Sequence, residues 1–72
     1  PGESVGEDPR FAVLTDRERG IAALVAEGLD NREIAGRLYL SEGTVRNRIS
    51  DILAKTNISN RTKLAVEWLA CH

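Results

Sequence analysis

Two helix-start motifs constrain this chain more than any other feature. Thr15-Asp16-Arg17-Glu18 and Asp30-Asn31-Arg32-Glu33 each place a short oxygen-bearing side chain three residues before a glutamate. In such a capping box the first side chain accepts a hydrogen bond from a first-turn amide, and the glutamate accepts one from the cap's own N–H. Because the second box follows the first so closely, the first helix must be short. The pattern predicts a domain built from short helices.

The spacing of apolar residues after each motif predicts the extent of the helices. Intervals of three and four indicate helices over residues 16–27, 31–39 and 42–55, and a fourth from Arg61 onward. Gly28 ends the first helix, since glycine adopts the left-handed conformation that stops helices. Ser41 caps the third, and Asn60 or Ser59 caps the fourth. No sustained alternation or hairpin dipeptide predicts a strand, so we expect an all-α fold, a compact four-helix bundle.

Length and composition exclude several function classes. The 72 residues, 42% of them hydrophobic, form one small domain with no space for a large active-site cleft. One cysteine, Cys71, and one histidine, His72, cannot form an internal disulfide or a Cys/His metal site. We expect no metal, no cofactor and no enzymatic activity, and assign Glu18 and Glu33 to capping. The lone cysteine and the absence of a membrane-length apolar run indicate a soluble, cytoplasmic protein.

Charge is distributed unevenly along the chain. Residues 1–13 are assigned to a flexible acidic linker, because residues 1–9 hold three acids, no base, two prolines and two glycines. Residues 14–72 form the domain. The net charge is −1, yet five bases accompany the single acid Asp51 within residues 44–63: Arg46, Arg48, Lys55, Arg61 and Lys63. This local excess suits a nucleic-acid partner, although charge alone favours an ordinary solvated face.

The junction between the second and third predicted helices is the most informative feature for function. Only Leu40 and Ser41 separate the two, so they must cross steeply, as in a helix-turn-helix. At about 100° per residue, four apolar residues of the third helix share one side: Val45, Ile49, Ile52 and Leu53. Arg46, Asn47 and Ser50 fall on the other side. Arginine pairs with guanine, asparagine with adenine and serine with several acceptors, so this face predicts DNA reading, with a helix-packing module as the alternative.

Three segments of the chain resemble a known family. Residues 14–19 (LTDRER), 27–35 (EGLDNREIA) and 40–47 (LSEGTVRN) are similar to the LuxR/NarL/FixJ-type DNA-binding domain of bacterial transcription regulators. The similarity is greatest to the C-terminal output domain of two-component response regulators, and it covers about residues 14–69. It implies a four-helix bundle whose third helix lies in the major groove and whose fourth helix pairs two copies.

The resemblance also implies roles for individual residues. Base contacts fall on Arg46, Asn47 and Ser50, and Arg46 is the best candidate for a guanine partner. DNA backbone contacts fall on or near Asn31, Ser41, Thr44 and Lys55. Many members carry His or Tyr where this chain has Arg48, which we assign to a phosphate or a neighbouring acid. The dimer interface falls on four residues of the fourth helix: Leu64, Val66, Trp68 and Leu69.

The expected partners are double-stranded DNA, a second copy of the chain and an upstream receiver domain in the full-length protein. One alternative is a protein-interaction module that docks a partner through the fourth helix, with Trp68 either an interface anchor or a core residue. A second alternative retains DNA binding but places the domain in a quorum-sensing receptor or a sigma-factor-like segment.

Overall fold

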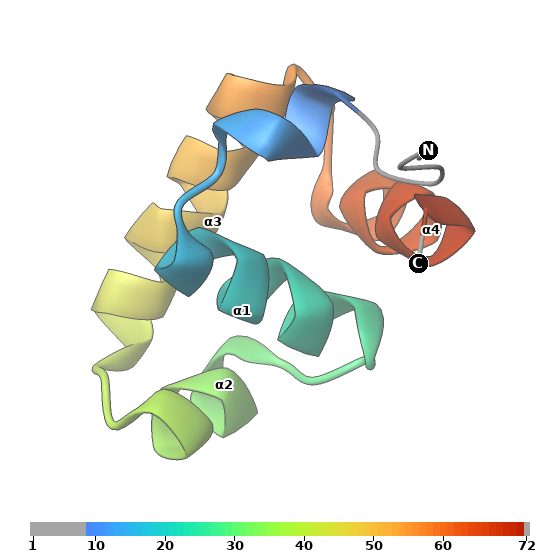
Figure 1. The fold of residues 1–72 in the computed structure, drawn as a ribbon. Coiled ribbons are helices and arrows are strands. Elements are labelled where there is room, and N and C mark those ends of the chain that lie inside the picture. Colours follow the sequence, from blue (N-terminus) through green and yellow to red (C-terminus); the bar gives the residue numbers. More distant parts are fainter. Residues whose placement is uncertain (1–8, 72) are drawn as a thin grey trace.

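Helices make up most of the chain that the structure describes. A computed structural model describes residues 9–71 and contains a short 3₁₀-helix followed by four α-helices (Figure 1). Their bounds are η1 (Pro9–Val13), α1 (Asp16–Ala26), α2 (Asn31–Leu38), α3 (Glu42–Thr56) and α4 (Arg61–Cys71). The predicted all-α class and the four predicted helices are confirmed, and no strand occurs within residues 9–71.

Reciprocal hydrogen bonds start the first two α-helices, as the capping boxes predicted. The Glu18 amide donates to Thr15 Oγ1 (3.2 Å) and the Thr15 amide donates to Glu18 Oε1 (2.9 Å). At the start of α2 the Glu33 amide donates to Asp30 Oδ1 (2.8 Å) and the Asp30 amide donates to Glu33 Oε1 (2.9 Å). These bonds satisfy amides that a helix leaves without intrahelical partners, so both helices begin at a defined residue.

Left-handed residues follow three of the helices. Gly28, with φ of 93°, lies just beyond α1, as predicted. Tyr39 and Asn57 end α2 and α3, and both have φ of 58°. At the start of α4 the Lys63 amide donates to Asn60 Oδ1 (2.9 Å), which identifies Asn60 as the cap. Each connection is therefore short, and the helices must pack directly on one another.

One hydrophobic core holds the helices together. α1 lies between α3 and α4 and contacts all three of the other α-helices (Figure 1). Every element contributes at least one fully buried large side chain: Phe11, Ile21, Ile34, Val45, Ile52 and Leu64. On α3, Val45, Ile49 and Ile52 are buried, so the predicted apolar side of this helix faces the core.

The N-terminal part of the chain differs from the expected linker over residues 1–13. Pro9–Val13 forms η1, and the Phe11 side chain is fully buried. The Phe11 ring meets the Trp68 ring edge-on, with centroids 5.1 Å apart and an interplanar angle of 62°. Arg10 also forms an ion pair with Glu67. Because the buried Phe11 ring packs on α4, Pro9–Val13 is part of the folded domain and not of a flexible linker. Residues 1–8 and His72 lie outside the described residues.

Candidate nucleic-acid interface

The side of α3 opposite the core carries the three residues predicted to read bases. Arg46, Asn47 and Ser50 are all exposed, whereas their neighbours Val45 and Ile49 are buried. α3 forms one edge of the domain, with α1, α2 and α4 packed to its other side (Figure 1). The structure thus places these three side chains together on an accessible helix face. A long guanidinium beside two short polar groups suits the major groove, which admits an α-helix and is lined by hydrogen-bonding base edges.

The first turn of α3 presents two linked hydroxyl groups. The Thr44 amide donates to Ser41 Oγ (3.1 Å), so Ser41 caps the helix as predicted. The Ser41 hydroxyl in turn donates to Thr44 Oγ1 (2.9 Å). The Thr44 hydroxyl keeps its own proton for an outside acceptor, since a hydroxyl both donates and accepts. Free amides and hydroxyl donors at a helix N-terminus are the usual partners of a phosphate.

Lys55 has a partner inside the protein that its local sequence does not indicate. Its Nζ donates to both carboxylate oxygens of Glu18, each at 2.9 Å, which joins α3 to the start of α1. Glu18 is buried, whereas the Lys55 side chain is 43% exposed. An ammonium has three donors, so one remains for a phosphate. The Lys55 assignment stays a prediction, now for a lysine whose position is set by a buried carboxylate.

The surroundings of Glu18 lower its pKa. The Thr15 amide that donates to the carboxylate is the largest cause, and the Lys55 ammonium adds to it, while burial acts in the opposite direction. A carboxyl group with a lowered pKa stabilises the fold above its unfolded pKa. That stabilisation is lost as the pH falls through the folded value, because the protonated group no longer matches its donors.

We therefore expect Glu18→Gln to lower the free energy of unfolding by about 1–2 kcal/mol at pH 7, since charged hydrogen bonds are lost but Lys55 is partly solvated. The difference from the wild type should shrink as the pH falls below about 4.5, the ordinary value for glutamate. Urea unfolding at pH 7 and pH 3 measures both. Glu33→Gln is the matched control, because Glu33 makes the same capping bonds in an exposed site. A Glu18→Gln effect equal to that of Glu33→Gln and independent of pH would show that the ion pair between Glu18 and Lys55 does not stabilise the fold.

Asn31 and Arg61 form a second contact between distant segments. Arg61 Nη1 donates to Asn31 Oδ1, and Arg61 Nη2 donates to the Leu29 carbonyl (2.6 Å). The start of α4 is thereby tied to the connection between α1 and α2. The bond between Arg61 and Asn31 leaves the side-chain NH₂ group of Asn31 directed away from Arg61, and that group and the backbone N–H are the donors that could contact a phosphate. The sequence indicates only a surface charge at Arg61, because no local pattern points to a partner 30 residues away.

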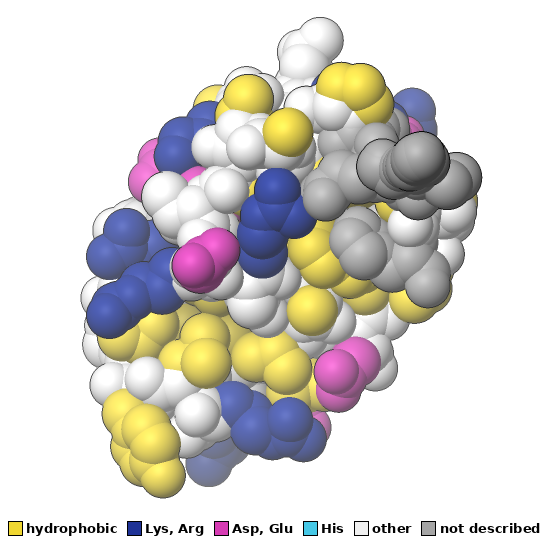
Figure 2. All heavy atoms as spheres, viewed as in Figure 1, with side chains coloured by type: hydrophobic (Ala, Val, Ile, Leu, Met, Phe, Trp, Pro, Cys, Tyr) yellow, Lys and Arg dark blue, Asp and Glu magenta, His cyan; other side chains and the backbone are white. Residues whose placement is uncertain are grey.

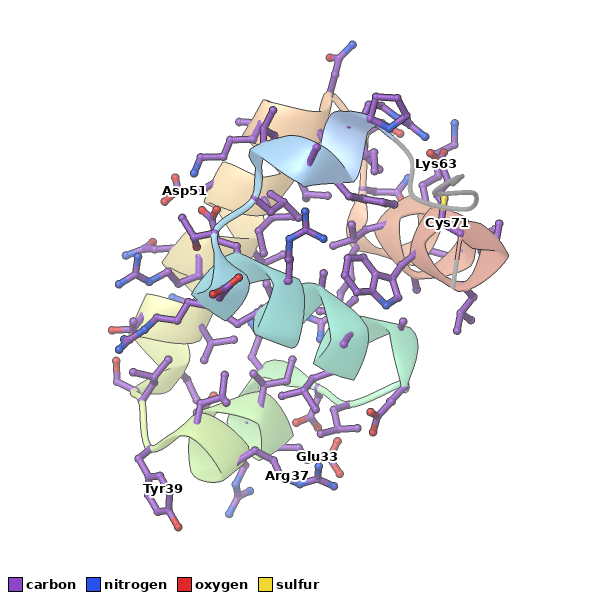
Figure 3. All side chains as sticks on the ribbon, viewed as in Figure 1. Glu33, Arg37, Tyr39, Asp51, Lys63 and Cys71 are labelled. Atoms are coloured by element: carbon purple, nitrogen blue, oxygen red, sulfur yellow. The ribbon has the colours of Figure 1, made fainter. Side chains whose placement is uncertain are left out.

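The basic residues of the C-terminal half remain largely accessible. Arg46, Lys55 and Lys63 are exposed, and Arg48 and Arg61 are partly exposed. Arg48 lies next to the buried side of α3, where the helical spacing placed it. Figure 2 shows Lys and Arg side chains along the α3 side of the domain and also at its α2 end, with acidic side chains among them. Asp51 also extends from α3 (Figure 3). Three of the five bases, Arg46, Arg48 and Lys55, therefore lie on the helix that carries the predicted base-reading residues, whereas Arg61 and Lys63 belong to α4, where Figure 3 shows Lys63.

The four residues assigned to the dimer interface separate into two groups. Leu64 and Trp68 are buried in the domain's own core, with 0% and 8% exposure. Val66 and Leu69 are exposed, at 61% and 62%. While α4 keeps this packing, Leu64 offers no surface to a second copy and Trp68 offers little. Val66 and Leu69 are therefore the stronger candidates.

Other kinds of site have little support among residues 9–71. No group of three or more His, Cys, Asp or Glu side chains there could hold a metal ion. No helix in that range is both long and apolar enough to cross a membrane. A hollow of about 350 Å³ lies between α1 and the turn after α2, but it is lined by none of the predicted DNA-contacting residues.

Comparison with known proteins identifies the family. Residues 12–68 match the profile described as bacterial regulatory proteins, LuxR family. The chain is 45% identical over 65 residues to the DNA-binding transcriptional activator DevR/DosR of Mycobacterium tuberculosis, covering 90% of this chain and 30% of that protein. It is 41% identical over 64 residues to the nitrate/nitrite response regulator protein homolog of Haemophilus influenzae, covering 89% of this chain and 31% of that one.

A third relative, the transcriptional regulatory protein DesR of Bacillus subtilis, is 52% identical over 48 residues, which are 67% of this chain and 24% of that protein. The chain therefore spans less than a third of the length of each of these relatives. The family match covers nearly the whole helical domain, from η1 to Trp68. This chain belongs to the LuxR family of bacterial regulatory proteins.

Proposed function

We propose that this domain binds double-stranded DNA in a sequence-specific manner to regulate transcription, with α3 in the major groove. The observation that carries the proposal is the exposed face of Arg46, Asn47 and Ser50 on the helix that follows a tight turn. A helix of this kind fits the groove, and these side chains match the donor and acceptor patterns of guanine and adenine. Family membership and a relative named as a DNA-binding transcriptional activator support it.

Five residues position the domain on the DNA backbone in this proposal. Ser41 and Thr44 supply hydroxyl and amide donors at the start of α3, while Asn31, Arg48 and Lys55 supply amide or cationic groups around it. Contacts of this type fix the register of the recognition helix without reading sequence. The three residues of α3 that point away from the core then meet base edges.

Two copies bind together in this proposal, through the exposed part of α4. Val66 and Leu69 are three residues apart and lie on one side of the helix. Covering them with the same residues of a second copy removes apolar surface from water. A single domain of this size buries only about 600–1,000 Å² on DNA, so pairing is needed to combine two weak contacts into tight binding.

We also propose that a receiver domain precedes this domain in the full-length protein. The support is the length of the relatives, each more than three times that of the matched segment, and the name of one as a response regulator homolog. The competing role for α4, docking of a protein partner through Trp68, has less support because Trp68 packs against Phe11 in the core.

Fluorescence anisotropy of labelled duplexes across a salt series tests the proposal, together with enrichment of binding sites from a random library. We expect the logarithm of the affinity to fall linearly with the logarithm of salt concentration, and an enriched inverted repeat. Leu69→Lys should bind one half-site as the wild type does but lose the cooperativity between two half-sites. Absence of binding at low salt would contradict DNA binding. An enriched site without symmetry would contradict pairing.

A further inference from the structure

Tyr39 is the most exposed large apolar residue that the structure describes. It lies in the turn between α2 and α3, its side chain is 94% exposed, and it ends α2 in the left-handed conformation, with φ of 58° and ψ of 44°. Figure 3 shows its ring extending away from the domain at the end where α2 and α3 meet. The ring thus contributes almost no packing to the core.

The fold alone gives no reason for tyrosine at this position. Glycine and asparagine are the residues that adopt the left-handed conformation most readily, and Asn57 ends α3 with nearly the same angles, φ of 58° and ψ of 33°. Tyrosine gains neither the conformational freedom of glycine nor the local hydrogen bond of asparagine. An aromatic side chain in a strained and solvated turn is therefore better explained by something outside the domain.

The position of Tyr39 relative to α3 indicates what that contact is. Tyr39 precedes Ser41, the cap of α3, by two residues. In a helix-turn-helix the N-terminal residues of the recognition helix reach the base edges, so the turn before it lies close to one of the phosphate backbones that border the groove. A phenol carries an uncharged O–H donor at the end of a rigid ring, and tyrosine is among the side chains that bind phosphates.

We propose that the Tyr39 hydroxyl donates a hydrogen bond to a DNA phosphate and so positions the first turn of α3 in the groove. This inference rests on the proposed DNA binding. It assigns Tyr39 to positioning the helix rather than to reading bases. It also makes the left-handed turn part of the binding surface, because the Tyr39 ring extends outward from that turn (Figure 3).

Tyr39→Phe tests the role of the hydroxyl alone, since it keeps the ring and the exposed position. We expect the variant to bind about 3–10-fold more weakly, to the enriched site and to a random duplex alike, which is the effect of one lost hydrogen bond. The slope of log affinity against log salt should not change, because an uncharged donor displaces no counterion. Its thermal unfolding should match that of the wild type. Tyr39→Asn, with a residue suited to the turn, should fold at least as stably yet bind as weakly as Tyr39→Phe.

Three outcomes would overturn the inference. Wild-type affinity in Tyr39→Phe would exclude a contact by the hydroxyl. Wild-type affinity in Tyr39→Phe together with weak binding by Tyr39→Asn would show that the ring, not the hydroxyl, makes the contact. Absence of DNA binding by the wild type would overturn this inference and the proposed function together, whereas the first two outcomes would overturn this inference alone.

Discussion

Phe11→Ala is expected to lower the free energy of unfolding by about 3–5 kcal/mol, the cost of removing a fully buried phenylalanine. Phe11 is 0% exposed and packs edge-on against Trp68, so its removal leaves a cavity between η1 and α4. A small domain has a total stability of only about 5–15 kcal/mol, and this loss is a large part of it. Urea unfolding followed by the fluorescence of Trp68, the single tryptophan of the chain, measures the change directly.

Val13→Ala is the matched control for Phe11→Ala. Val13 lies in the same 3₁₀-helix but is 56% exposed, so its truncation should change the stability by less than about 0.5 kcal/mol. In folded Phe11→Ala the Trp68 emission should shift to longer wavelength, because water reaches the ring. If Phe11→Ala unfolds at the same urea concentration as the wild type, η1 does not stabilise the domain. The folded domain would then begin at residue 14, as its sequence composition predicts.

The helices were predictable because their signals are local. Each cap lies three residues from the amide that it binds, as in the Asp30 and Glu33 pair, and each apolar stripe repeats within a few turns. Gly28 is likewise a single residue whose backbone preference is known in advance. Interactions of this range depend little on where the rest of the chain lies, so the periodic pattern carries them.

The contacts that join the helices were not predictable on the same basis. Glu18 and Lys55 are 37 residues apart, so sequence spacing gives no indication that the capping glutamate also binds a lysine of α3. The burial of Phe11 depends on Trp68 at the other end of the chain. The apolar run over residues 11–14 is too short to show the periodicity that identifies an element, and the acidic composition of the residues before it therefore assigned η1 to the linker.

The candidate interface shows the same division. The exposure of Arg46, Asn47 and Ser50 followed from the helical period of α3 once its apolar side was known. The separation of α4 into a buried and an exposed part did not follow from its helical period. Which side of α4 faces the core depends on how η1 and α1 pack against that helix. Trp68 illustrates the difficulty: its size suits an interface anchor and a core residue equally, and only the tertiary contact with Phe11 decides between them.

Arg46→Ala is expected to weaken binding to the enriched site by about 1–3 kcal/mol, roughly 5- to 150-fold, and to relax the preference at one base position. Arg46 is exposed on α3 and can donate two parallel hydrogen bonds to guanine, which no other base accepts in the same geometry. Its side chain is exposed, so the stability of the domain should stay within about 0.5 kcal/mol of the wild type. Anisotropy with the enriched duplex and with each single-base variant measures both effects.

Arg48→Ala separates base reading from general electrostatic attraction. This substitution removes the same charge from the same helix as Arg46→Ala does. Arg48, however, lies next to the buried side of α3, and its proposed contact is with the DNA backbone. Its loss should weaken all duplexes alike and make the salt dependence shallower by about one counterion. If Arg46→Ala also weakened all duplexes equally and left the base preference unchanged, α3 would present a different face to the DNA. The orientation proposed from the burial of Val45 and Ile49 would then be wrong, although DNA binding itself would stand.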